Sequence, residues 1–153
     1  MATDNAARNI NLNRDVTEQS RHTVEQLVDG FARQDIAQIM NLFAEDAVYC
    51  DVVGPGRRGS EYKGRKAIQG AFLEEFKTLG EHTYEASTIV AEGQTAFATW
   101  TLVLGRADNP AAPRFEGADH FALDKAGQVL LKNAWLNGQL ELSEVLNRGI
   151  RPD

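Results

Sequence analysis

Two aspartates stand inside apolar stretches of the sequence, where carboxyl groups are unusual. Asp51 lies in VYCDVVG and Asp119 lies in FEGADHFAL. Strict alternation over 115–123 puts Asp119 on the face that carries Phe and Leu side chains. An acid on such a face must be hydrogen-bonded, paired, or kept neutral by a raised pKa. We therefore take both as candidates for acid–base chemistry. The alternatives are a bulge that turns His120 inward, and an Asp51 that only binds turn amides.

Other kinds of catalytic centre lack their motifs. His22, His82 and His120 have no zinc-site spacing, and the chain contains no GxSxG or HExxH. The loop at 54–59 matches GxGxxG, but five residues separate it from the next helix and the later strands look antiparallel, which favours a flexible loop. Cys50, the single cysteine, is expected to be a small buried residue. We expect no metal and no organic cofactor.

Composition and charge narrow the class of protein. The chain has 153 residues, which suits one domain, and its 16 basic and 22 acidic residues give a net charge of -6. Such a charge disfavours nucleic acid as a partner. No apolar run is long enough for a membrane helix, and the first residues, MATDNAARNINLNRD, lack the apolar core of a signal peptide. We expect a cytoplasmic protein with no membrane partner.

The first half of the chain shows helical periodicity. Residues 1–15 have no period that could bury a face and are expected to form a flexible arm. Val24, Leu27, Val28 and Phe31 form the stripe of an amphipathic helix that starts near residue 15 or 17. We then expect a short helix capped by Asp35 and ending at 45–46, a strand at 47–53 and a helix at 65–79.

The second half shifts to the two-residue period of strands. Four strand-like runs, at 84–92, 95–105, 115–124 and 128–137, are separated by short turns and predict an antiparallel meander. Helices followed by a meander indicate an α+β domain with helices on one face of the sheet. We place this domain at residues 16–140. The tail at 141–153 is too short to fold alone and is expected to pack at the domain's edge or on a partner subunit.

The motifs resemble those of a known family. An LFAEDA corner at 42–47, GRKAIQGAF at 64–72 and GADHFALDKAGQV at 117–129 are similar to the NTF2-like superfamily, which includes ketosteroid isomerases and SnoaL-like polyketide cyclases. The resemblance covers about residues 24–138. It implies a cystatin-like cone, in which three helices pack on a strongly bent, mostly antiparallel sheet around an apolar interior, and it implies a homodimer.

Within that superfamily the ketosteroid isomerases are the closest resemblance. It implies that Asp51 is the general base and that Asp119 is a neutral acid in the oxyanion hole. The implied activity is proton transfer next to the carbonyl group of a small hydrophobic substrate, without a cofactor. The resemblance and the expected sheet faces place the following residues at the substrate: Leu27, Tyr49, Phe72, Trp100, Phe121, Ala134 and Leu136.

One departure from the isomerase pattern keeps other activities open. The residue aligned with the family's oxyanion tyrosine is Leu27, which donates no hydrogen bond, and Tyr49, Tyr62 and Trp100 are the other possible donors. A SnoaL-like cyclase or dehydratase that uses the same acidic pocket is the first alternative. A non-catalytic protein that binds a small ligand is the second. The water-activating set of limonene epoxide hydrolases is not present, since Trp100, Leu102 and Ala134 occupy its positions.

Overall fold

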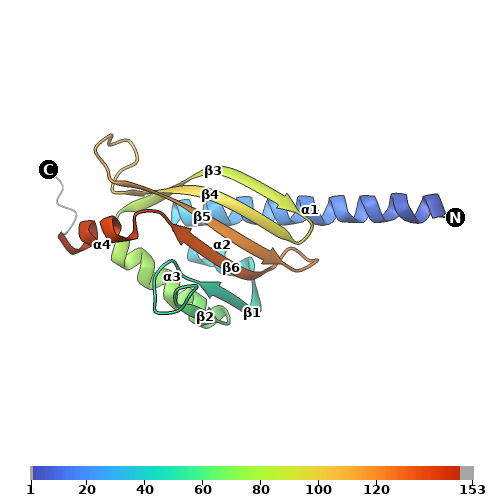
Figure 1. Cartoon of the computed structure of the whole chain (residues 1–153), viewed down its shortest axis with the longest axis horizontal. Coiled ribbons are helices and arrows are strands. Elements are labelled where there is room, and N and C mark those ends of the chain that lie inside the picture. Colours follow the sequence, from blue (N-terminus) through green and yellow to red (C-terminus); the bar gives the residue numbers. More distant parts are fainter. Residues whose placement is uncertain (1, 149–153) are drawn as a thin grey trace.

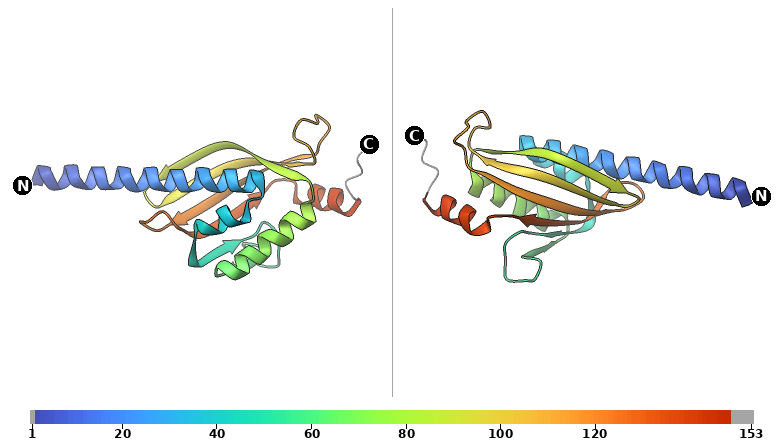
Figure 2. Two further views of the ribbon diagram at one scale, coloured as in Figure 1. Left: turned by 180° about the vertical axis from the view of Figure 1, so that it is seen from behind. Right: turned by 45° about the horizontal axis from the view of Figure 1, so that its top comes forward.

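The computed structural model describes residues 2–148 of the chain. Three helices lie on one face of a single six-stranded sheet, and a fourth lies beyond one end of it (Figure 2). None of the described helices is both long enough and apolar enough to cross a bilayer. The helices are α1 (Ala2–Arg33), α2 (Ile36–Asn41), α3 (Arg65–Leu79) and α4 (Gln139–Arg148).

The sheet is mostly antiparallel and has the order β2-β1-β6-β5-β4-β3. Strand β1 runs parallel to β6, while the other neighbours are antiparallel. A register shift between Ala86 and Thr88 marks a bulge in β3, a feature that bends a strand. The strands are β1 (Phe43–Cys50), β2 (Glu61–Lys63), β3 (His82–Glu92), β4 (Thr95–Leu104), β5 (Arg114–Leu123) and β6 (Val129–Leu136).

The core lies between α1, α2, α3 and the sheet. Residues at helical spacing supply one side of it and alternate residues of the strands supply the other, as periodicity requires. The Phe31 and Phe72 rings meet edge-on, with 5.0 Å between their centroids, and join α1 to α3. The fully buried core residues with large side chains include Val24, Leu27, Ile39, Phe43, Ile68, Phe72, Phe121, Leu123 and Val129.

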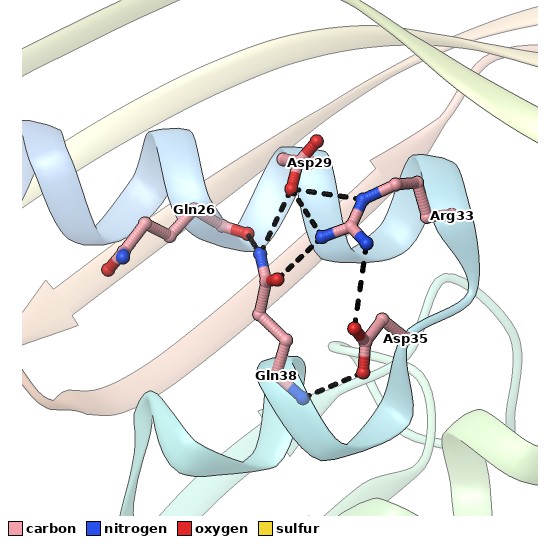
Figure 3. A network of polar contacts seen from close by, with 5 residues as sticks. All are labelled: Gln26, Asp29, Arg33, Asp35 and Gln38. Carbon is pink, nitrogen blue, oxygen red and sulfur yellow. Dashed lines mark hydrogen bonds and ion pairs between the residues drawn. The ribbon is translucent and has the colours of Figure 1, made fainter.

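The corner between α1 and α2 fixes the first helix pair. Gln34, the residue directly after α1, has a φ of 55°, and Asp35 caps α2 by accepting a hydrogen bond of 3.0 Å from the Gln38 backbone N–H. Figure 3 shows Arg33 donating to Asp29 and to the Gln38 side chain, at 2.7 and 2.6 Å. These groups are exposed, so the network orients the corner more than it stabilises the fold.

Several boundaries differ from those expected. Residues 2–15, expected as a flexible arm, continue α1, which extends well past the sheet (Figure 1). Ile10 and Leu12 are 68% and 63% exposed, so these two apolar side chains are not part of the core. Residue 1 and residues 149–153 of the expected tail lie outside the described residues. Within the described tail, residues 139–148 form α4.

The second helix ends earlier than expected. It stops at Asn41 instead of 45–46, because Phe43 and Ala44 enter the sheet as the start of β1. The Val129 N–H donates to the Leu42 carbonyl at 2.8 Å, which ties this segment to the start of β6. The short strand β2 was not predicted from the sequence. Its three residues pair with β1 and lack a pattern of their own.

Candidate active site

A cavity of about 330 Å³ opens between the helices and the sheet. Helices α1, α3 and α4 and all six strands contribute to its wall. The wall is largely apolar, and its charged residues are the acidic Asp51, Glu74, Glu75 and Asp119 together with the basic Lys132. The Gln139 side chain of α4 donates to the Val52 carbonyl at 2.5 Å, so α4 is attached to the loop that follows β1. A mostly apolar cavity with a small number of polar groups is typical of a small-molecule binding site.

Asp51 comes directly after the last residue of β1. Its backbone N–H donates to the Ser60 carbonyl at 2.9 Å, which closes the base of the intervening loop. Its carboxylate Oδ1 accepts two hydrogen bonds, one of 2.6 Å from the Val52 N–H and one of 3.1 Å from the Tyr49 hydroxyl. The turn-amide role considered for Asp51 is thus present together with a place on the cavity wall. Both hydrogen bonds use Oδ1, which leaves Oδ2 for a ligand.

Asp119 faces inward and forms a buried ion pair. The Lys132 ammonium on β6 donates to Asp119 Oδ1 at 2.9 Å, and these side chains are only 6% and 9% exposed. Burial raises the pKa of Asp119, while the charge and hydrogen bond of Lys132 act in the opposite direction. His120 points to the other face and stacks on Phe97, with 4.8 Å between ring centroids. The expected alternation of β5 is therefore observed.

Lys132 is a site residue that the sequence analysis missed. Its Nζ lies 4.9 Å from the centroid of the Tyr49 ring and 5.4 Å from that of Phe31, so two aromatic faces stabilise the buried cation. A signal was available, since Lys132 alternates with Ala134 and Leu136, both expected on the inner face. A lysine at an inward position of an apolar strand is as unusual as an aspartate there.

Glu75 and Tyr84 are two further groups missed by the sequence analysis. The Tyr84 hydroxyl donates to Glu75 Oε1 at 2.5 Å. Glu75 is partly exposed because it borders the cavity. Burial among protein atoms raises its pKa, while the Tyr84 hydrogen bond and the Lys132 charge act in the opposite direction. Burial, aided by nearby carboxylates, also holds the pKa values of the Tyr49 and Tyr84 phenols well above 10. Both tyrosines thus stay protonated donors.

The family model of the SnoaL-like domain matches residues 24–131, which is most of the chain. The chain belongs to the SnoaL-like family. This agrees with the resemblance noted from the LFAEDA, GRKAIQGAF and GADHFALDKAGQV motifs, and the NTF2-like fold expected from it is confirmed. No protein of curated function matches the sequence.

Solved structures share the fold at low sequence identity. An NTF2-like protein from Mesorhizobium loti is 20% identical, with a TM-score of 0.66 over 80% of this chain and 93% of the other. A ketosteroid isomerase candidate from Kribbella flavida is 18% identical, with a TM-score of 0.64 over 90% and 84%. A polyketide cyclase candidate from Xanthomonas campestris pv. campestris is 19% identical, with a TM-score of 0.62 over 83% and 96%.

Of the residues expected at the substrate site, some line the cavity of this SnoaL-like protein and others lie in its core. Asp51, Asp119, Tyr49, Trp100, Ala134 and Leu136 line the cavity. Leu27, Phe72 and Phe121 are buried in the core and are not part of the cavity wall. Among the described residues, no three His, Cys, Asp or Glu side chains lie close enough together to hold a metal ion.

Replacing Asp119 alone should destabilise the SnoaL-like domain strongly. In Asp119→Leu the Lys132 ammonium stays buried without its partner, and such a loss typically costs about 3–5 kcal/mol. The double variant Asp119→Leu/Lys132→Met removes both charges and should recover most of that stability. Urea denaturation of wild type, Asp119→Leu, Lys132→Met and the double variant measures the difference. Additive losses in the double variant would show that the two charges do not act as a pair.

Glu75 should make stability depend on pH. Its folded-state pKa lies above the ordinary value of 4.5, so the folded protein binds this proton more tightly than the unfolded chain does. The stability linked to Glu75 is therefore complete below about pH 4.5 and decreases as pH rises through the folded-state pKa. Glu75→Gln, which still accepts from Tyr84, should gain melting temperature over wild type at pH 8 but not at pH 4. The same difference in melting temperature between Glu75→Gln and wild type at pH 4 and at pH 8 would contradict this prediction.

Proposed function

We propose that this SnoaL-like protein is an isomerase-like enzyme that moves a proton next to the carbonyl group of a small hydrophobic substrate. The observation that carries the proposal is one largely apolar cavity that holds both a carboxylate with a free oxygen and a buried ammonium group. Enolisation needs these two elements, a base for the carbon-bound proton and a positive group for the enolate oxygen.

Asp51 is the base in this proposal. Its Oδ1 is held by Val52 and Tyr49, so Oδ2 is the oxygen that takes the proton from the carbon next to the carbonyl. The C–H bond breaks and its electron pair becomes the enolate, or a dienolate if the neighbouring carbons are unsaturated. The protonated Asp51 then returns the proton to the far carbon. The double bond moves, and no atom is gained or lost.

Lys132 stabilises the enolate oxygen. The resemblance to ketosteroid isomerases assigned that role to a neutral Asp119. Burial does raise the pKa of Asp119, but the Lys132 ammonium 2.9 Å away opposes that effect and is itself a charged donor on the cavity wall. We therefore assign the hydrogen-bond donation to Lys132 and make Asp119 the residue that positions it. Only one of the three Lys132 N–H groups is needed for Asp119, which leaves donors for a ligand.

The cavity limits the substrate to a small molecule. A volume of about 330 Å³ lies at the low end for sites that enclose drug-sized ligands. Aromatic and aliphatic side chains such as Phe31, Leu102 and Leu136 form much of the wall. A compact cyclic ketone fits these conditions. The cavity wall has more acidic than basic side chains, which disfavours a substrate that carries an anionic group besides the enolate.

Asp51→Asn should slow proton transfer strongly. The wild-type protein is mixed with cyclohex-3-enone, and absorbance of the conjugated enone and deuterium uptake from heavy water are followed. We expect Asp51→Asn to lose about 10²–10⁴-fold in rate, because the amide cannot accept the proton. Asp46→Asn, an exposed residue on β1, is the matched control and should keep the wild-type rate. A wild-type rate equal to buffer, or an unchanged rate in Asp51→Asn, would disprove the proposal.

Glu75 favours a polyketide-cyclase activity as the second candidate. Ring closure by an enolate needs an acid that protonates the attacked carbonyl oxygen. Glu75 shares the cavity with Asp51, and burial keeps it protonated to higher pH than an exposed glutamate. In such a step Asp51 takes the carbon-bound proton, a carbon–carbon bond forms at the second carbonyl, and the Glu75 proton goes to its oxygen.

A diketone probe distinguishes the two candidates. With heptane-2,6-dione, a cyclase gives the six-membered ketol, detected by NMR, whereas an isomerase gives only deuterium exchange beside the carbonyl groups. Glu75→Gln should then stop ring closure and leave exchange intact. Exchange without any ketol in the wild-type protein would remove the cyclase candidate and leave the isomerase proposal standing.

A further inference from the structure

The indole N–H of Trp100 is a buried donor that the fold leaves unused. Its Nε1 and the His82 Nε2 are the buried side-chain polar atoms without a hydrogen-bond partner in the described part of the chain. A buried group left unpaired costs about 1–3 kcal/mol, so native proteins retain few of them without a reason. His82 does not line the cavity, whereas Trp100 does. The position of Trp100 points to a ligand as the missing partner.

The Trp100 ring is held in place by contacts that do not use its N–H. Trp100 on β4 is opposite Gly117 on β5. A side chain at Gly117 would overlap the six-membered ring of the indole, so only glycine lets the ring lie over that strand. The Tyr84 ring meets the indole edge-on, with centroids 5.3 Å apart and planes at 88°. The donor is thus fixed in direction before any ligand arrives.

The Trp100 N–H lies beside the buried ion pair. It is close enough to Asp119 to help lower the pKa of that carboxyl group, but their geometry falls short of a hydrogen bond. Lys132 donates to the same carboxylate from β6. Two donors from different strands, Trp100 on β4 and Lys132 on β6, therefore lie near the same carboxyl group, and both residues line the cavity.

We propose that Trp100 is the second donor to the substrate's enolate oxygen, beside Lys132, and that Gly117 is its positioning residue. This inference rests on the proposed function for its catalytic consequence. Trp100 and Lys132 then supply the hydrogen bonds to the enolate oxygen. Leu27, which stands at the position of the family's tyrosine, cannot supply one. An indole N–H donates and does not accept, so the site selects a ligand oxygen that is an acceptor, such as an enolate or a phenolate.

The test measures binding of para-nitrophenol as an enolate mimic, at a pH where it is ionised. The chain has two tryptophans, and Trp135, which is 50% exposed, does not line the cavity. In a ¹H–¹⁵N spectrum, the Trp135→Phe variant identifies the Trp100 indole resonance. We expect the Trp100 indole proton to move downfield when para-nitrophenolate binds, and the Trp135 resonance to stay in place.

The Trp100→Phe variant keeps the aromatic packing and removes the N–H. It should bind para-nitrophenolate about 10-fold or more weakly, the loss expected for a hydrogen bond to a charged group. Gly117→Ala displaces the ring and should weaken binding in the same direction, which gives a second variant if Trp100→Phe folds poorly. Trp135→Phe is the matched control, and its affinity should equal that of wild type.

The outcomes separate this inference from the proposed function. Absence of para-nitrophenolate binding, a stationary Trp100 resonance in the bound protein, or full affinity in both Trp100→Phe and Gly117→Ala would overturn the role of Trp100. A wild-type protein that binds para-nitrophenolate through Trp100 but exchanges no carbon-bound proton would disprove the enzyme proposal alone. Asp51→Asn should lose exchange and still show the Trp100 shift.

Discussion

The buried pair of Lys132 and Asp119 is the interaction on which the site depends. Removing an ammonium and a carboxylate from water costs several kcal/mol for each ion, and only a close contact with further favourable partners offsets this. Here a 2.9 Å hydrogen bond joins them, and the centroids of the Tyr49 and Phe31 rings lie 4.9 and 5.4 Å from the cation. A positive group is thereby kept inside an apolar cavity, where its electrostatic effect on a ligand is larger than in water.

The sheet topology brings the other groups to that pair. Because β1 is parallel to β6 and paired with it, Tyr49 is opposite Lys132, and Asp51 follows at the same end of the strand. Strand β5 lies on the other side of β6 and supplies Asp119, and β4 lies beyond it with Trp100. Four strands, which come from residues 43–136 of the sequence, thus supply one side of the cavity.

Three of the acidic side chains on the cavity wall, Asp51, Glu75 and Asp119, have different hydrogen-bond partners. Asp119 has a cation as its partner, Glu75 has only a neutral phenol, and Asp51 has a backbone N–H and a phenol. Groups of one chemical type can therefore act as positioning residue, acid and base in one cavity. The SnoaL-like family and its fold do not choose between isomerase and cyclase, since one fold hosts many reactions. Whether the site favours isomerase or cyclase chemistry depends on these local contacts.

The sequence alone predicted the fold class and favoured the inward direction of Asp119, because helix and strand periods and an apolar face are local properties of the chain. Its motifs indicated the family. It could not place the end of α2, where Phe43 and Ala44 leave a helical pattern to pair in the sheet, or the helix at residues 2–15. Tertiary structure decided that Lys132 is the partner of Asp119, that Glu75 meets Tyr84, and that Phe72 and Phe121 are core residues. The physical reason is that periodicity gives the face on which a side chain lies, whereas its partner across that face depends on strand order and register.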